Sequence, residues 1–154
     1  MNQRILRTVY AAACLALGAC QDTGPAANFD DGAWEFQVTS LWAEPEGGVA
    51  NPTDPLDDAD YTPVDDAAGW SLLVSDHRDT IALTDIADDT KTIDGTLGDP
   101  VGDRLHYDLT EGVFAGGRFE VWDDGFLRAE LTIYGSGVPI AQSARGDLVQ
   151  IIGL

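Results

Sequence analysis

The stretch RFEVWDDGFLRAEL, residues 118–131, carries the pattern that decides the fold class. Apolar side chains alternate with polar ones on both sides of a short Asp-Asp-Gly segment. A period of two residues is typical of a half-buried β-strand, and a glycine-containing acidic segment between two such runs is typical of a hairpin turn. The stretch therefore predicts a β-hairpin with one face against a core.

The charges on the outer face select a register for this hairpin. A three-residue loop, 123–125, sets apolar residues opposite each other inside and opposite charges beside each other outside, whereas a two-residue loop, 124–125, mixes them. The pairs predicted by the longer loop are Val121 with Leu127, Phe119 with Ala129, Glu120 with Arg128 and Arg118 with Glu130. Because each outer ion pair contributes roughly 0.2–1 kcal/mol, the three-residue loop is predicted, with Gly125 in the left-handed conformation.

The same alternation recurs over most of the remaining chain. Trp34, Phe36 and Val38 alternate with polar residues in the first strand candidate. The other candidates are 70–75, 80–86, 92–97, 104–110, 138–144 and 148–152. Short strands separated by Gly- and Asp-rich turns predict an all-β domain, either a single antiparallel barrel or a sandwich of about eight strands.

One long segment, 43–68, interrupts the strand pattern. It contains four prolines, is rich in aspartate and glutamate, and has no periodicity. A loop of this length in a compact domain is usually functional or disordered, so we expect a cation or a basic protein to bind here. No cofactor is expected, and calcium is the alternative, because hard cations prefer several oxygen ligands. The candidate ligands are Asp57, Asp58, Asp60, Asp65 and Asp66.

The first residues have the features of an export signal. Arg4 and Arg7 precede an apolar segment, Thr8–Ala19, that is shorter than the about 20 residues needed to span a bilayer. The ending Leu17-Gly18-Ala19-Cys20 resembles the lipobox of bacterial lipoproteins. The resemblance implies cleavage before Cys20 and lipidation of its thiol and new amine; the alternative is an ordinary secretory signal with a chance cysteine.

The chain thus has three expected parts and an expected location. Residues 1–19 are the signal peptide, 20–31 the lipidated N-terminus and tether, and 32–154 a single β domain. Two or more acyl chains hold a protein firmly on a bilayer. The expected location is the cell envelope, and the outer membrane in a Gram-negative cell, because Gln21 is not the aspartate that signals retention at the inner membrane.

The charge of the chain excludes one class of partner. All 27 acidic residues follow Cys20, whereas two of the eight basic residues precede it, so the mature chain has a formal charge of −21. Such a surface repels nucleic acid.

Only Cys20 remains after cleavage, so no internal disulfide can form and stability must come from packing.

Catalytic motifs are scarce. Ser75-Asp76-His77 has the residue types of a hydrolytic triad, but neighbours on a strand point to opposite faces, so the tripeptide is not evidence for a triad. A small hydrolase that combines carboxylates of the acidic loop with His77 remains the enzymatic alternative.

A second resemblance concerns the barrel itself. Gly32-Ala33-Trp34 is similar to the Gly-x-Trp signature of lipocalins and related calycins, and Arg145 lies near the end of the last long strand. The resemblance implies that Arg145 packs across Trp34 at the closed end of the barrel, with loop 43–68 at the open mouth. A mouth of this kind binds one small apolar ligand.

The function expected from these observations is that of a lipid-anchored, non-enzymatic binding or interaction module. Its partners are the membrane, through the anchor, and either a basic protein or a small apolar ligand. Trp122 points outward from its hairpin and is a candidate contact residue. A purely structural envelope lipoprotein is the other alternative.

Overall fold

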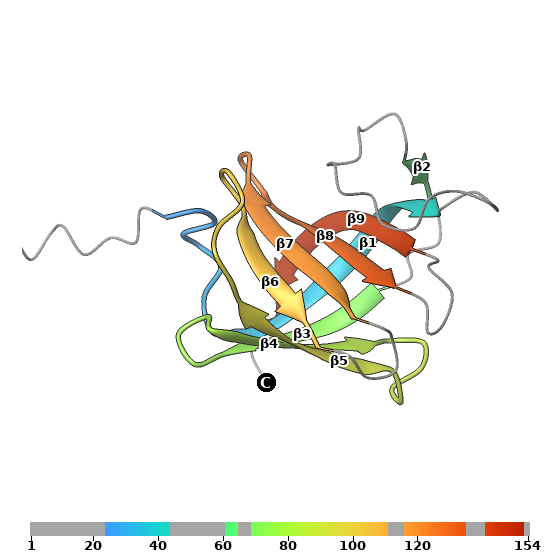
Figure 1. The fold of residues 1–154 in the computed structure, drawn as a ribbon, viewed down its shortest axis with the longest axis horizontal. Coiled ribbons are helices and arrows are strands. Elements are labelled where there is room, and N and C mark those ends of the chain that lie inside the picture. The colour runs from blue at the N-terminus through green and yellow to red at the C-terminus, as the bar shows by residue number, and fades with distance from the viewer. Residues whose placement is uncertain (1–23, 44–60, 65–68, 111–115, 135–140, 153–154) are drawn as a thin grey trace, which may run out of the picture.

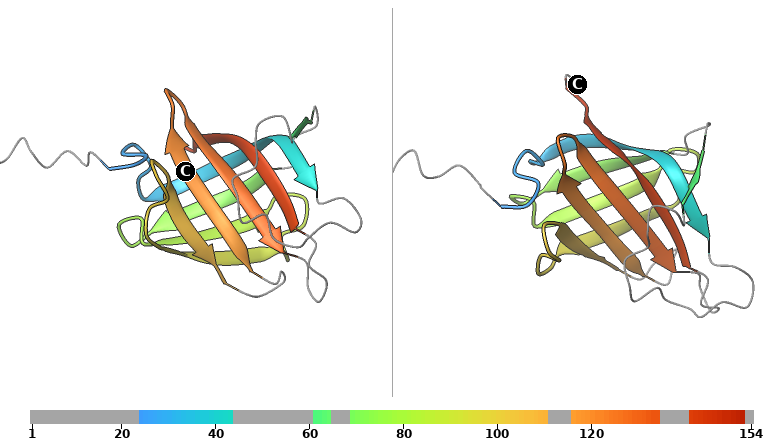
Figure 2. Two further views of the ribbon diagram at one scale, coloured as in Figure 1. Left: turned by 45° about the horizontal axis from the view of Figure 1, so that its top comes forward. Right: turned by 90° about the horizontal axis from the view of Figure 1, so that it is seen from above.

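The computed structural model describes residues 24–43, 61–64, 69–110, 116–134 and 141–152. These residues form a closed antiparallel barrel of eight strands with one short additional strand, as Figures 1 and 2 show. The all-β fold class predicted from the sequence is therefore confirmed, and the barrel is the correct alternative. In the described part of the chain, no helix is long and apolar enough to cross a membrane.

The strands follow one another around the barrel almost in chain order. They are β1 (Gly32–Ala43), β2 (Thr62–Pro63), β3 (Gly69–Ser75), β4 (Thr80–Asp85), β5 (Thr92–Leu97), β6 (Leu105–Leu109), β7 (Gly117–Asp123), β8 (Leu127–Tyr134) and β9 (Ala141–Gln150). Each pairs antiparallel with the next from β3 to β9, and β1 closes the barrel by pairing with both β3 and β9. The short β2 pairs with β1 alone, at Ser40 and Leu41.

The closure between β1 and β9 contains an irregularity and a required glycine. The register of the two strands shifts between Val38 and Ser40, which marks a β-bulge. Gly146 lies opposite Val38, and a Cβ at this position would overlap the carbonyl oxygen of Gln37. Only glycine allows the two backbones to approach so closely. The sequence pattern predicts a break here, between strands 138–144 and 148–152; this is wrong, because β9 continues through it with partners on both sides.

The β7–β8 hairpin has the predicted faces but not the predicted register. Its loop is 124–126, closed by Asp123 opposite Leu127, so Val121 lies opposite Ala129 and Glu120 lies opposite Glu130. The carboxylate of Asp123 accepts a hydrogen bond of 2.9 Å from the N–H of Gly125 and thereby starts the turn one residue later than expected. Gly125 does take a positive φ, of 108°. Since the error is an even number of residues, every side chain keeps its face.

The barrel interior is filled by apolar side chains. Its large, fully buried members are Phe29, Phe36, Leu72, Leu83, Tyr107, Phe119 and Leu131. The rings of Phe36 and Phe119 pack edge to face, with their centroids 5.6 Å apart. The interior is therefore a packed core, and the cavity described below lies on the outside of the barrel wall.

One end of the barrel is capped by residues that the sequence pattern places in the tether. Phe29 is fully buried, and its ring contacts those of Trp34 and Tyr107 at centroid distances of 5.2 and 6.4 Å. The Asp31 carboxylate accepts the N–H groups of His77 and Arg78 in the β3–β4 turn. The packed domain therefore includes Ala26 and Phe29, which precede the expected start at residue 32. Neither could be predicted, because a single phenylalanine without periodic neighbours gives no strand signal.

Candidate functional site

A polar layer covers the outer face of β7, β8 and β9. Outward-facing positions of a barrel are normally exposed, but here Glu120, Glu130, Thr132 and Ser143 are buried. The hydroxyl groups of Thr132 and Ser143 are 2.8 Å apart and share a hydrogen bond. Polar groups removed from water need partners, so the arrangement above this layer must supply them.

Glu130 is the centre of this layer and is only 1% exposed. Its carboxylate accepts a hydrogen bond of 2.7 Å from Nε of Arg145, and it lies 3.7 Å from Nη1 of Arg104 and 3.9 Å from Nη2 of Arg118. These arginines come from β9, from the residue before β6, and from β7. Three cations from three segments thus surround one buried carboxylate.

Glu120 lies directly opposite Glu130 and has its own partners. It accepts a hydrogen bond of 3.0 Å from Nη1 of Arg104, and Nδ1 of His106 is 3.4 Å from its other oxygen. Like charges opposite each other on a sheet are destabilising unless they are compensated. The guanidinium of Arg104 bridges the two carboxylates and makes the pair tolerable.

Two of the arginines are stacked on aromatic rings. Arg104 lies over Trp122 at 4.2 Å from the ring centroid, and Arg145 lies over Tyr61 at 4.0 Å. Tyr61 directly precedes β2, so the short additional strand brings it over the barrel wall. Carboxylate and ring together fix the orientation of each guanidinium plane.

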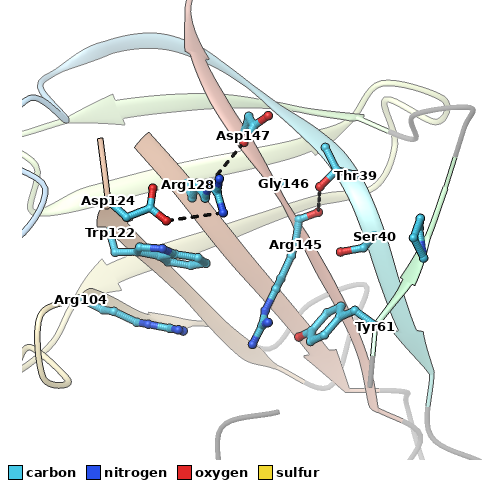
Figure 3. A pocket seen from close by; sticks show the side chains of 11 residues that line it. Thr39, Ser40, Tyr61, Arg104, Trp122, Asp124, Arg128, Arg145, Gly146 and Asp147 are labelled. Carbon is cyan, nitrogen blue, oxygen red and sulfur yellow. Dashed lines mark hydrogen bonds and ion pairs between the residues drawn. The ribbon is translucent and has the colours of Figure 1, made fainter. Parts of the chain in front are cut away.

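These residues form the floor and walls of a cavity of about 560 Å³ on the outside of the barrel (Figure 3). At its rim, Arg128 is half exposed and lies 3.5 Å from a carboxylate oxygen of Asp124 and 3.9 Å from one of Asp147. The lining residues are Thr39, Ser40, Tyr61, Pro63, Arg104, Trp122, Asp124, Arg128, Arg145, Gly146 and Asp147. We call this cavity the outer pocket; its size is in the range of small-molecule sites.

The hydroxyl group of Tyr61 is the unsatisfied group of the outer pocket. Tyr61 is 9% exposed, and its hydroxyl oxygen is buried without a well-formed hydrogen bond, although Ser143 and Glu130 are close enough to influence it. Burial raises the pKa of Tyr61 to about 12, and the negative charge of Glu130 acts in the same direction. The group is therefore a neutral hydrogen-bond donor at physiological pH.

The structure separates two residues that the lipocalin resemblance brings together. Trp34 points into the barrel and lies opposite Gln150, whereas Arg145 lies on the outside, opposite Ser40. Arg145 stacks on Tyr61, and the Trp34 indole donates its hydrogen bond to the carbonyl oxygen of Asp30. The expected packing of Arg145 across Trp34 is therefore wrong. Trp122, in contrast, does line a cavity on the outer face, as its position on the hairpin suggests.

The other candidate residues do not join this site. The Ser75 hydroxyl pairs with that of Thr80 at 2.9 Å, and Asp76 also contacts Thr80, at 3.1 Å. His77 meets Asp31 through its backbone N–H, in a turn whose residues 76–78 all have positive φ. No group of three or more potential metal ligands gathers among the described residues. Cys20 and the five candidate calcium ligands, Asp57, Asp58, Asp60, Asp65 and Asp66, lie outside the described residues.

Sequence reasoning named Trp122 and Arg145 as candidates and missed the other residues that build the pocket. Arg104, Glu120 and Glu130 were visible as charges on strands, but adjacent charges on a surface strand usually contact solvent. The one available signal was the set of charges on the outer face of the hairpin, for which complementary ion pairs were predicted, whereas the structure places Glu120 opposite Glu130. Tyr61 was hidden in an aperiodic acidic segment.

Comparison of the chain with models of protein families, with curated proteins and with solved structures finds no match.

Proposed function

We propose that this protein is a lipid-anchored, non-enzymatic binding module of the bacterial cell envelope, and that its binding site is the outer pocket. The observation that carries the proposal is the contrast between the two sides of the barrel wall. The interior is packed with aromatic and aliphatic side chains, whereas the outer face has a cavity with oriented polar groups. The mouth of the barrel is therefore no longer the favoured site for a ligand.

The position of the capped end supports the proposed anchor. Ala26 is buried in the cap, and residues 21–25 lie between it and Cys20. Even a fully extended chain spans at most about 3.6 Å per residue, so a lipid on Cys20 would keep this end of the barrel within roughly 22 Å of the membrane.

Exposed apolar side chains lie at the same end of the barrel. Phe126 is 74% exposed at the tip of the β7–β8 hairpin, next to Asp123, which accepts a hydrogen bond from Asn28 of the cap. Ile151 and Ile152 are also exposed and follow β9, where the N–H of Ile151 bonds to the carbonyl oxygen of Ala33. Side chains of this kind are suited to contact with a lipid surface, although the acidic charge of the protein disfavours anionic headgroups.

Lipidation is tested in cells with radiolabelled palmitate. The wild-type chain should incorporate label and the Cys20→Ser variant should not. Equal labelling of the two proteins would contradict the anchor, and labelling of neither would identify the leader as an ordinary secretory signal.

Binding at the outer pocket is tested on the mature protein in detergent. Trp122 lies in the pocket wall, so its fluorescence should respond to a pocket ligand. A panel of neutral, anionic and cationic small molecules should contain compounds that change the emission of the wild type but not of Trp122→Phe. A panel without any such compound, tested to millimolar concentration, would contradict the proposal.

The acidic segment 43–68 remains a second candidate for recognition, of calcium or of a basic protein. Its concentration of like charges motivates this prediction, because a bound cation relieves their repulsion. Calcium titration should then raise the melting temperature, and replacement of Asp57, Asp58, Asp60, Asp65 and Asp66 by Asn should abolish the effect. A hydrolase built on His77 has no such support, since its neighbours in the β3–β4 turn are engaged elsewhere.

A further inference from the structure

We propose that the outer pocket binds a small organic anion, with the carboxylate or phosphate group of the ligand held between Arg104 and Arg145 and hydrogen-bonded by the hydroxyl of Tyr61. This inference rests on the proposed function, because it names the ligand class of the same pocket. Figure 3 shows the ends of the two arginine side chains and the tyrosine hydroxyl turned toward one another.

The distribution of positive charge singles out this face of the barrel. After Cys20 the chain has only six basic residues. Four of them lie on one outer face of β6 to β9: Arg104, Arg118, Arg128 and Arg145. A protein with a mature charge of −21 gains nothing in solubility from such a cluster, and three of these arginines surround the two buried glutamates.

The orientation of Arg104 favours a ligand with paired oxygens. The hydrogen bond and ion pairs of Arg104 with described residues all use Nη1, so its Nη2 and Nε atoms keep their donors. The side chain is 25% exposed at the pocket, and its stacking on Trp122 fixes the plane in which these donors lie. A pre-oriented guanidinium fork matches the two oxygens of a carboxylate or phosphate.

The unsatisfied hydroxyl of Tyr61 points to the same ligand class. A buried hydroxyl without a hydrogen bond is destabilising, and such groups in native structures call for an explanation. Its neutral state at physiological pH makes it a donor, and an anion in the pocket would supply the missing acceptor. A cationic ligand would instead face the guanidinium groups of Arg104 and Arg145 at the place where Tyr61 offers its hydroxyl.

Four probes separate the ligand classes: glucose, glucuronate, glucose 6-phosphate and inorganic phosphate. Glucuronate and glucose 6-phosphate both share the ring of glucose and differ from glucose in carrying an anionic group. In calorimetric titrations of the mature protein in detergent, at low salt, we expect glucuronate or glucose 6-phosphate to bind and glucose not to bind. The affinity should fall as salt is raised to roughly 0.15 M, where charges are screened over about 8 Å.

Three variants connect binding to the named groups. Arg104→Gln should lower the affinity for glucuronate or glucose 6-phosphate about tenfold or more, which is the usual effect of losing a hydrogen bond to a charged group. Tyr61→Phe should weaken it several-fold while leaving the melting temperature nearly unchanged, because the hydroxyl has no well-formed hydrogen bond to lose. Lys91→Gln changes the net charge by the same amount on a remote turn and should leave affinity unchanged.

The outcomes distinguish this inference from the proposed function. Binding of glucose as tight as that of the acids would overturn the anion assignment but keep the pocket as a binding site. Binding of acids that Arg104→Gln and Tyr61→Phe leave unchanged would place the anion elsewhere and overturn the inference. No response to any probe would overturn it too, and the fluorescence panel on Trp122 would then decide whether the pocket binds another class of ligand.

Discussion

Replacement of Glu130 is the most direct test of the polar layer outside the barrel. Glu130→Gln keeps the shape of the side chain and removes its charge, and Glu130→Ala removes the whole group. In the wild type this carboxylate is 1% exposed and contacts Arg145 at 2.7 Å, with Arg104 and Arg118 within 4 Å. Either change removes the negative charge that these three arginines face in the polar layer.

The structure allows the size of each effect to be worked out. The amide introduced by Glu130→Gln can still accept one hydrogen bond, so the loss should be that of one charge-assisted bond, about 1.5–3 kcal/mol. Glu130→Ala also removes the buried carboxylate that three partly buried guanidinium groups face, and removal of one partner of a buried ion pair typically destabilises by about 3–5 kcal/mol. For a domain of this size, 1 kcal/mol corresponds to roughly 4 °C, so the melting temperature should fall by roughly 6–12 °C for the first variant and 12–20 °C for the second.

The assay is reversible urea unfolding followed by tryptophan fluorescence, with a thermal melt for comparison. Asp89→Asn is the matched control, because Asp89 is exposed in the β4–β5 turn and its change should stay within about 0.5 kcal/mol. If Glu130→Ala unfolds within about 1 kcal/mol of the wild type, the carboxylate is neither buried nor paired as described. The double variant with Arg145→Met should recover part of the loss, since it removes the charge left behind.

Three further changes test the barrel and its cap. Gly146→Ala should destabilise by about 1–3 kcal/mol in the same urea assay, because the new Cβ overlaps the Gln37 carbonyl oxygen and the two strands must separate; unchanged stability would contradict the close approach. Phe29→Ala should destabilise by about 3–5 kcal/mol and expose the barrel end to a hydrophobic dye, whereas an unaltered melt would return this residue to the tether. Backbone N–H groups hold the pKa of Asp31 below its usual 3.8, so its carboxylate stabilises the fold above that pH and loses this effect as the pH falls through the lowered value. Asp31→Asn should therefore lower the melting temperature at pH 7 but not in strong acid, and a difference that persists in acid would exclude the charge as the cause.

The fold could be predicted from the sequence because its signal is local. Alternation in residues such as Phe119, Val121, Ala129 and Leu131 identifies strands and their buried faces without any knowledge of neighbours. The register of their hairpin could not be obtained in the same way. The Asp123–Gly125 hydrogen bond starts the turn one residue later, and Arg104, which comes from another part of the chain, makes Glu120 opposite Glu130 acceptable.

The candidate site is a tertiary property and left little trace in the sequence. Tyr61 reaches it from the acidic segment, and Arg145 belongs to it because the two ends of the barrel wall meet. Trp122 was identified because an aromatic side chain on the outer face of a hairpin is unusual by itself. The expected partner of Trp34 was wrong because a three-residue signature says nothing about which side of the wall Arg145 occupies.

The pairing of β1 with β9 has a consequence for how the chain acquires its structure. The first and last strands are neighbours, so the barrel cannot close until residues near Gln150 are available. Folding that depends on contacts so distant in sequence is slow, and one edge of β1 stays without its partner until then. A newly made chain passing through a pore from its N-terminus would thus remain open, and vulnerable to pairing with other chains, until almost its whole length had emerged.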